Sequence, residues 1–236
     1  IFGRSEGKRF SEKICYIYTK QLEEADHIVV NKCELLDSPE REALSFELER
    51  RFPQTPVFWI SARGGEGCEP WFDRLLESQL GDKSAMKLDY DRYAEGEAQL
   101  GWLNATYSLS SNMEVDADEF LSGAAQNISR ELSLRQMEIA HLKMTLQPDD
   151  ASGEIASIHQ VGSDRIPELG LHLLDPFTRA TLIVNLRAEG RPADLRECVQ
   201  LGLSANSIPG YRVTLEHMDH FQPGRPVPTH RDPGGG

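Results

Sequence analysis

Two short polar segments carry residue types that suit the recognition of a purine base. The first holds Asn31, Lys32 and Glu34, and the second holds Ser61 and Ala62. A carboxylate such as that of Glu34 can accept hydrogen bonds from both the ring N–H and the exocyclic amine of guanine, a pair that adenine does not offer. Asn31 and the stem of Lys32 can pack around the base, and a backbone N–H beside the small Ala62 can meet the guanine carbonyl. Such a site discriminates strongly, because a wrong base leaves buried polar groups unpaired.

Each polar segment follows an apolar run that predicts a strand buried on both faces. These runs cover residues 27–30 and 56–60 and are short and almost wholly apolar. Helices are expected at residues 11–25, 38–51 and 69–80, the first with Ser11 as its N-cap and the second capped by Ser38-Pro39. In the third helix we expect four apolar side chains to face inward: Trp71, Phe72, Leu75 and Leu76.

Alternating helices and strands predict a parallel sheet with right-handed crossovers. Such sheets bind ligands at the carboxyl ends of their strands, where both polar segments fall. The alternative for Asn31, Lys32 and Glu34 is an ordinary polar loop after a strand. Cys33 between them is interpreted as a small filler, and the glycine-rich residues 64–67, which contain no Lys, as a turn beside the base.

The pattern changes in a polar segment near residues 81–91, which we interpret as a linker. Apolar and polar residues then alternate, as in strands with one buried face. The predicted order is strand, helix, three strands, helix, strand, close to a split βαβ (ferredoxin-like) fold with one added strand. The elements are expected at residues 103–109, 116–134, 140–146, 155–161, 180–188, 192–205 and 211–221. The fold class is therefore α/β followed by α+β.

Composition excludes several classes of protein. The net charge of −13 and the pI near 5.0 argue against nucleic acid as a partner, since such binding depends on clustered Lys and Arg. No apolar stretch approaches the length that crosses a membrane, and no basic amphipathic helix suits a membrane surface. The four cysteines are widely spaced without a C-x-x-C pair, which fits a reducing compartment, so we expect a cytoplasmic protein.

One cluster near the end of the chain has ligand types for Zn²⁺ or a similar transition metal. It consists of His217, Asp219 and His220, with His230 further on. In a strand His217 and Asp219 share a face while His220 points away, so the alternative is a set of solvated histidines. For His141 and His159, on neighbouring predicted strands, the alternatives are a cross-strand pair and a surface position.

The strand before residues 31–34, the Ser61-Ala62 loop with its glycines, and an α+β domain after them resemble CobW-type proteins of the CobW/HypB/UreG group of P-loop GTPases. The helix before the guanine loop and residues 223–231 are also similar to that group. In the family the first segment reads N-K-x-D; here Glu34 stands where Asp is usual, which moves the carboxylate by about 1.5 Å.

This resemblance implies a GTP-binding, GTP-hydrolysing metallochaperone or metal-insertion protein with Mg²⁺ and a client metalloprotein; it leaves a homo-oligomer open. No G-x-x-x-x-G-K-[ST] phosphate loop occurs in the sequence. We therefore expect residues 1–82 to be the C-terminal half of a GTPase domain, with the phosphate loop, Mg²⁺ ligands and catalytic residues before Ile1. Residues 83–100 would be a linker, 101–221 the α+β domain and 222–236 a Pro/Gly-rich tail. The alternative is a non-catalytic interaction module with a relic GTPase half.

Overall fold

The computed structural model describes residues 12–77, 99–150, 152–206 and 210–223. The described residues fall into two compact units: one contains residues 15–77, and the other contains residues after 98 together with residues 12–14 at the start of the first helix. Several predicted features lie outside the described residues: the cap at Ser11, the linker near residues 81–91 and the tail with His230. The chain combines a parallel sheet with an antiparallel sheet, as the α/β and α+β patterns predicted.

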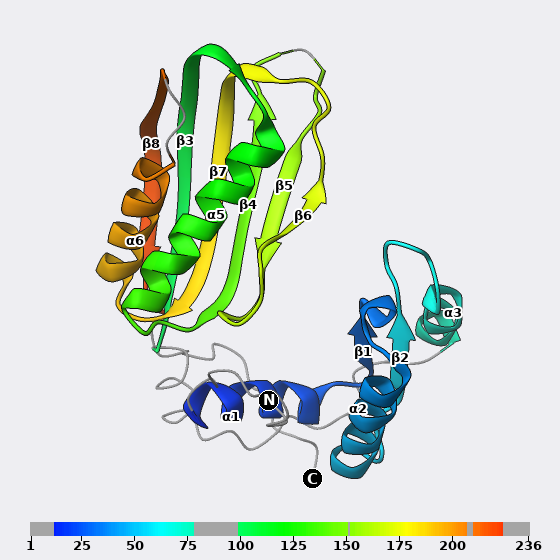
Figure 1. The fold of residues 1–236 in the computed structure, drawn as a ribbon. Coiled ribbons are helices and arrows are strands. Elements are labelled where there is room, and N and C mark those ends of the chain that lie inside the picture. The colour runs from blue at the N-terminus through cyan, green and yellow to red at the C-terminus, as the bar shows by residue number, and fades with distance from the viewer. Residues whose placement is uncertain (1–11, 78–98, 151, 207–209, 224–236) are drawn as a thin grey trace. The chain divides into compact units, whose positions relative to one another are not determined.

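The first unit is built on two parallel strands (Figure 1). Its elements are α1 (Glu12–Glu24), β1 (Ile28–Asn31), a 3₁₀ turn (Cys33–Leu35), α2 (Ser38–Arg51), β2 (Val57–Ile60) and α3 (Cys68–Glu77). The register runs from Ile28 opposite Val57 to Asn31 opposite Ile60, so the carboxyl ends of both strands are level. Their two following loops therefore begin at the same edge of the sheet.

Helix α2 begins differently from the sequence prediction. Asp37, not Ser38, is its N-cap: the Asp37 carboxylate accepts from the Glu40 N–H at 2.8 Å, and the Glu40 carboxylate accepts from the Asp37 N–H at 3.2 Å. This reciprocal capping box needs an acidic residue three positions after the cap, which Asp37 has in Glu40. Pro39 lies in the first turn as predicted.

The core of the first unit is small. Its cluster of buried side chains consists of Ile28, Leu48 and Phe52, with partly buried residues around them. The predicted inward face of α3 is wrong: Phe72 is 51% exposed and Leu76 is 87% exposed, and no residue of α3 is buried. The apolar spacing is present, but within the described residues no layer covers it.

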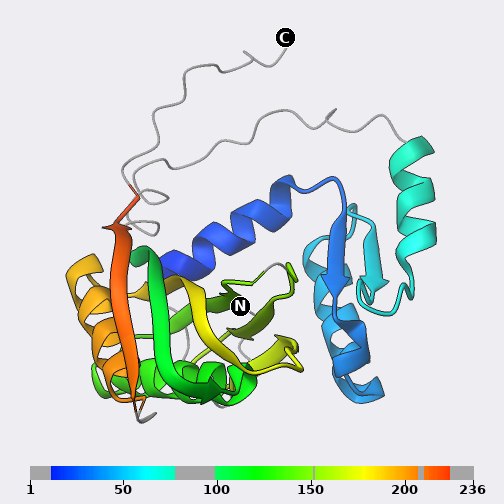
Figure 2. The ribbon, with the colours of Figure 1, turned by 90° about the horizontal axis from the view of Figure 1, so that it is seen from above.

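The second unit is a six-stranded antiparallel sheet with both of its helices on one face (Figures 1 and 2). The strand order is β6-β5-β4-β7-β3-β8. Its elements are β3 (Leu100–Val115), α5 (Ala117–Leu134), β4 (Ile139–Pro148), β5 (Ala156–Gln160), β6 (Glu168–Leu171), β7 (Phe177–Glu189), α6 (Pro192–Ser204) and β8 (Tyr211–Phe221). The sequence prediction missed β6 and made β3 too short.

A continuous core lies between this sheet and its helices. Alternate residues of β3, including Leu103 and Leu109, belong to the same buried cluster as the α5 side chains Phe120 and Ile128, which are fully buried. Helices α5 and α6 approach closely at Gly202, where an added Cβ would lie 2.6 Å from the Ile128 side chain. Strand β3 thus has the single buried face that its alternation predicted.

Candidate functional site

The two predicted base-recognition loops meet at the level carboxyl ends of β1 and β2. The Ala62 backbone N–H donates a hydrogen bond to Asn31 Oδ1 at 3.0 Å, across 31 positions of sequence. Because parallel strands end at one edge of their sheet, this contact follows directly from the register of Asn31 opposite Ile60. The sequence showed only that each polar segment follows a strand. The structure shows that the two segments are in contact.

The chain turns sharply immediately after Asn31. Lys32 adopts the left-handed conformation, with φ 63° and ψ 36°, and its carbonyl accepts from the Leu35 N–H at 3.0 Å. A non-glycine residue in this region is uncommon and marks a constrained turn. The turn leads into the 3₁₀ helix that carries Glu34, while Cys33 beside it is buried, as expected for a filler.

Ser61 is the hub that holds the second loop. It is buried, and its N–H donates to the Glu66 carbonyl at 2.9 Å while its own carbonyl accepts from the Gly65 N–H at 2.7 Å. Its hydroxyl oxygen accepts from the Gly64 N–H at 3.2 Å and donates to the Glu34 carboxylate. One serine thus ties the glycine turn to the carboxylate of the neighbouring loop.

The Glu34 carboxylate is exposed and held in place by donors. Its own backbone N–H and then the Ser61 hydroxyl hydrogen-bond to it, and Arg63 and Lys32 lie near enough to add positive charge. Together they hold the pKa of the Glu34 carboxyl below its usual range. An ionised carboxylate held in this way can accept hydrogen bonds from two N–H groups on one edge of a planar ligand.

The glycine turn that follows Ser61 has no room for a side chain at Gly67. Gly65 and Gly67 have positive φ values of 79° and 69°. A Cβ at Gly67 would lie 2.0 Å from the Trp59 carbonyl oxygen, whereas one at Gly65 would meet nothing within 4 Å. The segment is therefore a turn packed onto β2, in agreement with the sequence interpretation.

Sequence reasoning missed a second contact that fixes this loop. The Arg41 guanidinium of α2 lies 5.0 Å from the centre of the Trp59 ring and 4.0 Å from the Glu66 carboxylate. Beside them is a shallow hollow of about 280 Å³ lined by α2 residues and Trp59. An arginine spaced two residues after Pro39 gave no signal of this role, because its partners lie on another element.

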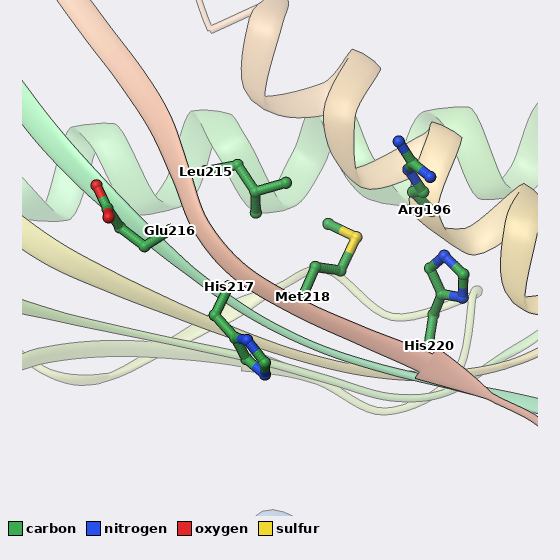
Figure 3. A pocket seen from close by; sticks show the side chains of 6 residues that line it. All are labelled: Arg196, Leu215, Glu216, His217, Met218 and His220. Atoms are coloured by element: carbon green, nitrogen blue, oxygen red, sulfur yellow. The ribbon is translucent and has the colours of Figure 1, made fainter.

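The predicted metal cluster is not assembled. His217 Nε2 and Asp219 Oδ2 are 2.8 Å apart on the exposed face of β8, as the shared strand face predicted. His220 instead lies beside Arg196 in a hollow of about 320 Å³ between β8 and α6, and His217 points away from that pair (Figure 3). Within the described ranges, no group of three or more His, Cys, Asp or Glu side chains could hold a metal ion.

His141 and His159 belong to β4 and β5, and the structure places them differently from a direct pair. The register sets His159 opposite Lys143, and His159 Nε2 lies 3.8 Å from Glu168 of β6. Both histidines are half-buried.

Among the helices that the structure describes, none is long and apolar enough to span a membrane.

Comparisons with known proteins give two distant structural matches. One is a Zn(II)-bound triple mutant of the YjiA GTPase, at 15% identity, and the other is Zn(II)-bound YjiA GTPase from E. coli, at 16% identity. Each alignment has a TM-score of 0.27 and covers 77% of this chain and 53% of the matched chain. The chain thus spans about half the length of these structures. No protein-family profile matches the sequence, and no curated protein matches it.

Proposed function

We propose that the first unit recognises guanine, and that the chain is the base-recognising and C-terminal part of a CobW-like GTP-binding and GTP-hydrolysing metallochaperone or metal-insertion protein. The observation that carries the proposal is the joined pair of loops. Asn31 Oδ1 accepts from the Ala62 N–H at 3.0 Å, and Ser61 hydrogen-bonds to Glu34. A carboxylate oriented by its neighbours at the end of parallel strands suits the N–H edge of guanine.

In this proposal the residues of the chain bind and orient the base. Glu34 would accept the two guanine N–H groups, and Ser61 would hold that carboxylate in position. Phosphate contacts, Mg²⁺ and the attacking water would come from a P-loop region outside the chain. Since base contacts alone remain, we expect millimolar affinity, about 4 kcal/mol, and no measurable GTP turnover by residues 1–236.

The second unit is proposed to be a split βαβ (ferredoxin-like) domain that binds a client metalloprotein. The support is its central order β4-β7-β3-β8, in which α5 links β3 to β4 and α6 links β7 to β8. The β5–β6 pair then extends the sheet beyond β4. Cytoplasmic location is part of the same proposal.

The test is a nuclear magnetic resonance titration of the 236-residue chain with guanosine monophosphate and, separately, adenosine monophosphate. We expect shifts at residues 31–34 and 61–67 with guanosine monophosphate, and weaker binding of the adenine nucleotide. Glu34→Ala should remove that preference, while Glu77→Ala, an exposed carboxylate at the end of α3, should keep it. Equal affinity of the unsubstituted chain for both nucleotides would contradict guanine recognition.

One observation favours a second candidate, a non-catalytic interaction module. Strand β8 is long, largely exposed and, among the described strands, paired only with β3. Such an edge can accept another strand by main-chain hydrogen bonds. Unchanged resonances at residues 31–34 and 61–67 with either nucleotide would favour this candidate over the first.

A further inference from the structure

The second unit has two very different sheet edges. Strand β6 has 4 residues, whereas β8 has 11, and only β3 pairs with β8 among the strands that the structure describes. The hollow in Figure 3 opens beside β8 and is lined by five of its residues and by Arg196. A long open edge presents a row of unpaired backbone N–H and C=O groups that another strand can use.

A β-bulge divides β8 into two halves. Thr106 of β3 lies opposite His217 and the next residue, Tyr107, lies opposite Leu215, so Glu216 is the extra residue. The Glu216 carboxylate accepts from the Ser108 hydroxyl at 2.7 Å, which draws its side chain over the sheet face that carries Ser108. The bulge reverses the alternation of side chains between the two halves.

On the helix side, β8 consequently places odd-numbered residues before the bulge and even-numbered residues after it. Tyr211 and Val213 before the bulge, and Met218 after it, pack against the core on the helix side. Arg212 lies opposite Ser110 of β3 and Asp219 lies opposite Asn104, so both face the helix-free side. In an antiparallel pairing of β8 with itself, side chains match only when the first half lies opposite the second half.

We propose that β8 pairs with β8 of a second copy of this chain, antiparallel, with Arg212 opposite Asp219. The two-fold symmetry of such a pair forms this ion pair twice. It also sets Val213 opposite Met218 on the helix side and Thr214 opposite His217 on the other side. The two six-stranded sheets become one continuous sheet, and the backbone groups at both edges are paired.

Charge selects this register from its neighbours. A shift that sets Arg212 opposite Phe221 keeps the faces matched, but it sets Asp219 opposite Thr214, which carries no charge. A shift that sets Arg212 opposite His217 places Val213 opposite the bulged Glu216. Opposite charges directly across two strands stabilise the pairing and like charges destabilise it. This inference is independent of base recognition, since it uses no residue of the first unit.

The test is sedimentation velocity of the 236-residue chain over a range of concentrations. We expect a dimer whose dissociation constant rises roughly tenfold or more in Arg212→Asp and in Asp219→Arg, because each change makes two like-charge pairs. An equal mixture of the two variants should restore the dimer, since a strand with two carboxylates then lies opposite a strand with two guanidinium groups. Arg130→Glu on α5, which changes the charge as Arg212→Asp does, should leave dimerisation unchanged.

Circular dichroism confirms first that the variants are folded. The doubly substituted chain, Arg212→Asp with Asp219→Arg, provides a second arm and should dimerise with itself. A chain that is monomeric at every concentration overturns the proposal. A dimer that neither single variant weakens also overturns the proposal, because the two copies would then be joined through residues other than Arg212 and Asp219. Weakened single variants that fail to recombine overturn the register.

Discussion

Helices α3 and α5 show how differently the two units use the same apolar spacing. Helix α5 buries Phe120, Leu121 and Ile128 completely against its sheet. Helix α3 has a comparable apolar stripe, yet Phe72 and Leu76 stay exposed. Helical periodicity therefore defines a stripe on a helix, but the presence of a facing layer decides whether that stripe becomes core.

The energetic consequence that we expect is a second unit that is stable by itself. Each fully buried large apolar side chain contributes roughly 1.5–3 kcal/mol, and the second unit has one continuous cluster of them. Among residues 15–77, the buried cluster consists of Ile28, Leu48 and Phe52, and Ile17, Cys33 and Ile60 are buried outside it. We expect the second unit to remain folded under conditions that open the first.

The largest difference is expected in limited proteolysis. A nonspecific protease should digest the first unit early and leave a resistant core close to residues 101–221, identified by mass spectrometry, because local stability follows buried apolar contacts. Survival of residues 12–77 while the later strands are digested would reverse the comparison.

A matched pair of substitutions sharpens the contrast between the two helices. Phe120→Ala should lower the free energy of unfolding of the second unit by about 3–5 kcal/mol, because it leaves a cavity at a fully buried site. Phe72→Ala, at a half-exposed site on α3, should change stability by about 0.5 kcal/mol or less. Urea denaturation followed by circular dichroism measures both. Similar losses would mean that α3 is covered in solution.

A smaller effect is expected at the glycine turn of the first unit. Both Gly65→Ala and Gly67→Ala place a side chain at positive φ, which costs about 1–2 kcal/mol. Gly67→Ala adds a collision with the Trp59 carbonyl, worth about 1–3 kcal/mol more. Thermal unfolding should therefore rank Gly67→Ala well below Gly65→Ala. Equal melting temperatures would show that the turn is not held against β2.

The smallest effect concerns the pH dependence of the loop itself. Hydrogen-bond donors lower the pKa of Glu34 in the folded chain relative to the unfolded chain. The ionised carboxylate therefore stabilises the folded loop fully above the unfolded pKa of about 4.3, and this contribution is lost as pH falls through the folded pKa. Carbon-13 NMR titration of the side-chain carboxyl should show Glu34 titrating lower than ordinary glutamates. Ser61→Ala should move it upward; no movement would remove Ser61 from this role.

Sequence periodicity was sufficient to predict strands in which apolar and polar residues alternate over most of their length. Strand β8 matches its predicted bounds, and β3 has the one buried face that its alternation predicted. Strand β6 escaped prediction, since Glu168–Leu171 is short and includes a glycine.

For the candidate site, the meeting of Asn31 with Ala62 could be anticipated from the carboxyl ends of parallel strands. The hub at Ser61 and the contact of Arg41 with Trp59 could not be, because each depends on the fold of a loop or on a side chain from a different element. In contrast, the failure of His217 and His220 to converge could be anticipated, because alternation along a strand puts these two side chains on opposite faces.

The hydrogen bond between Asn31 and Ala62 has a consequence for the proposed recognition of guanine. The Ala62 N–H, the donor expected to meet the guanine carbonyl, is already occupied by an amide oxygen. An incoming base would exchange one carbonyl acceptor for another at that N–H, and such an exchange has little net free energy. In the proposed guanine site, the Asn31 side chain therefore takes the position of the base carbonyl at the Ala62 N–H. Discrimination between bases would then depend on Glu34, whose carboxylate offers what no neighbouring group replaces.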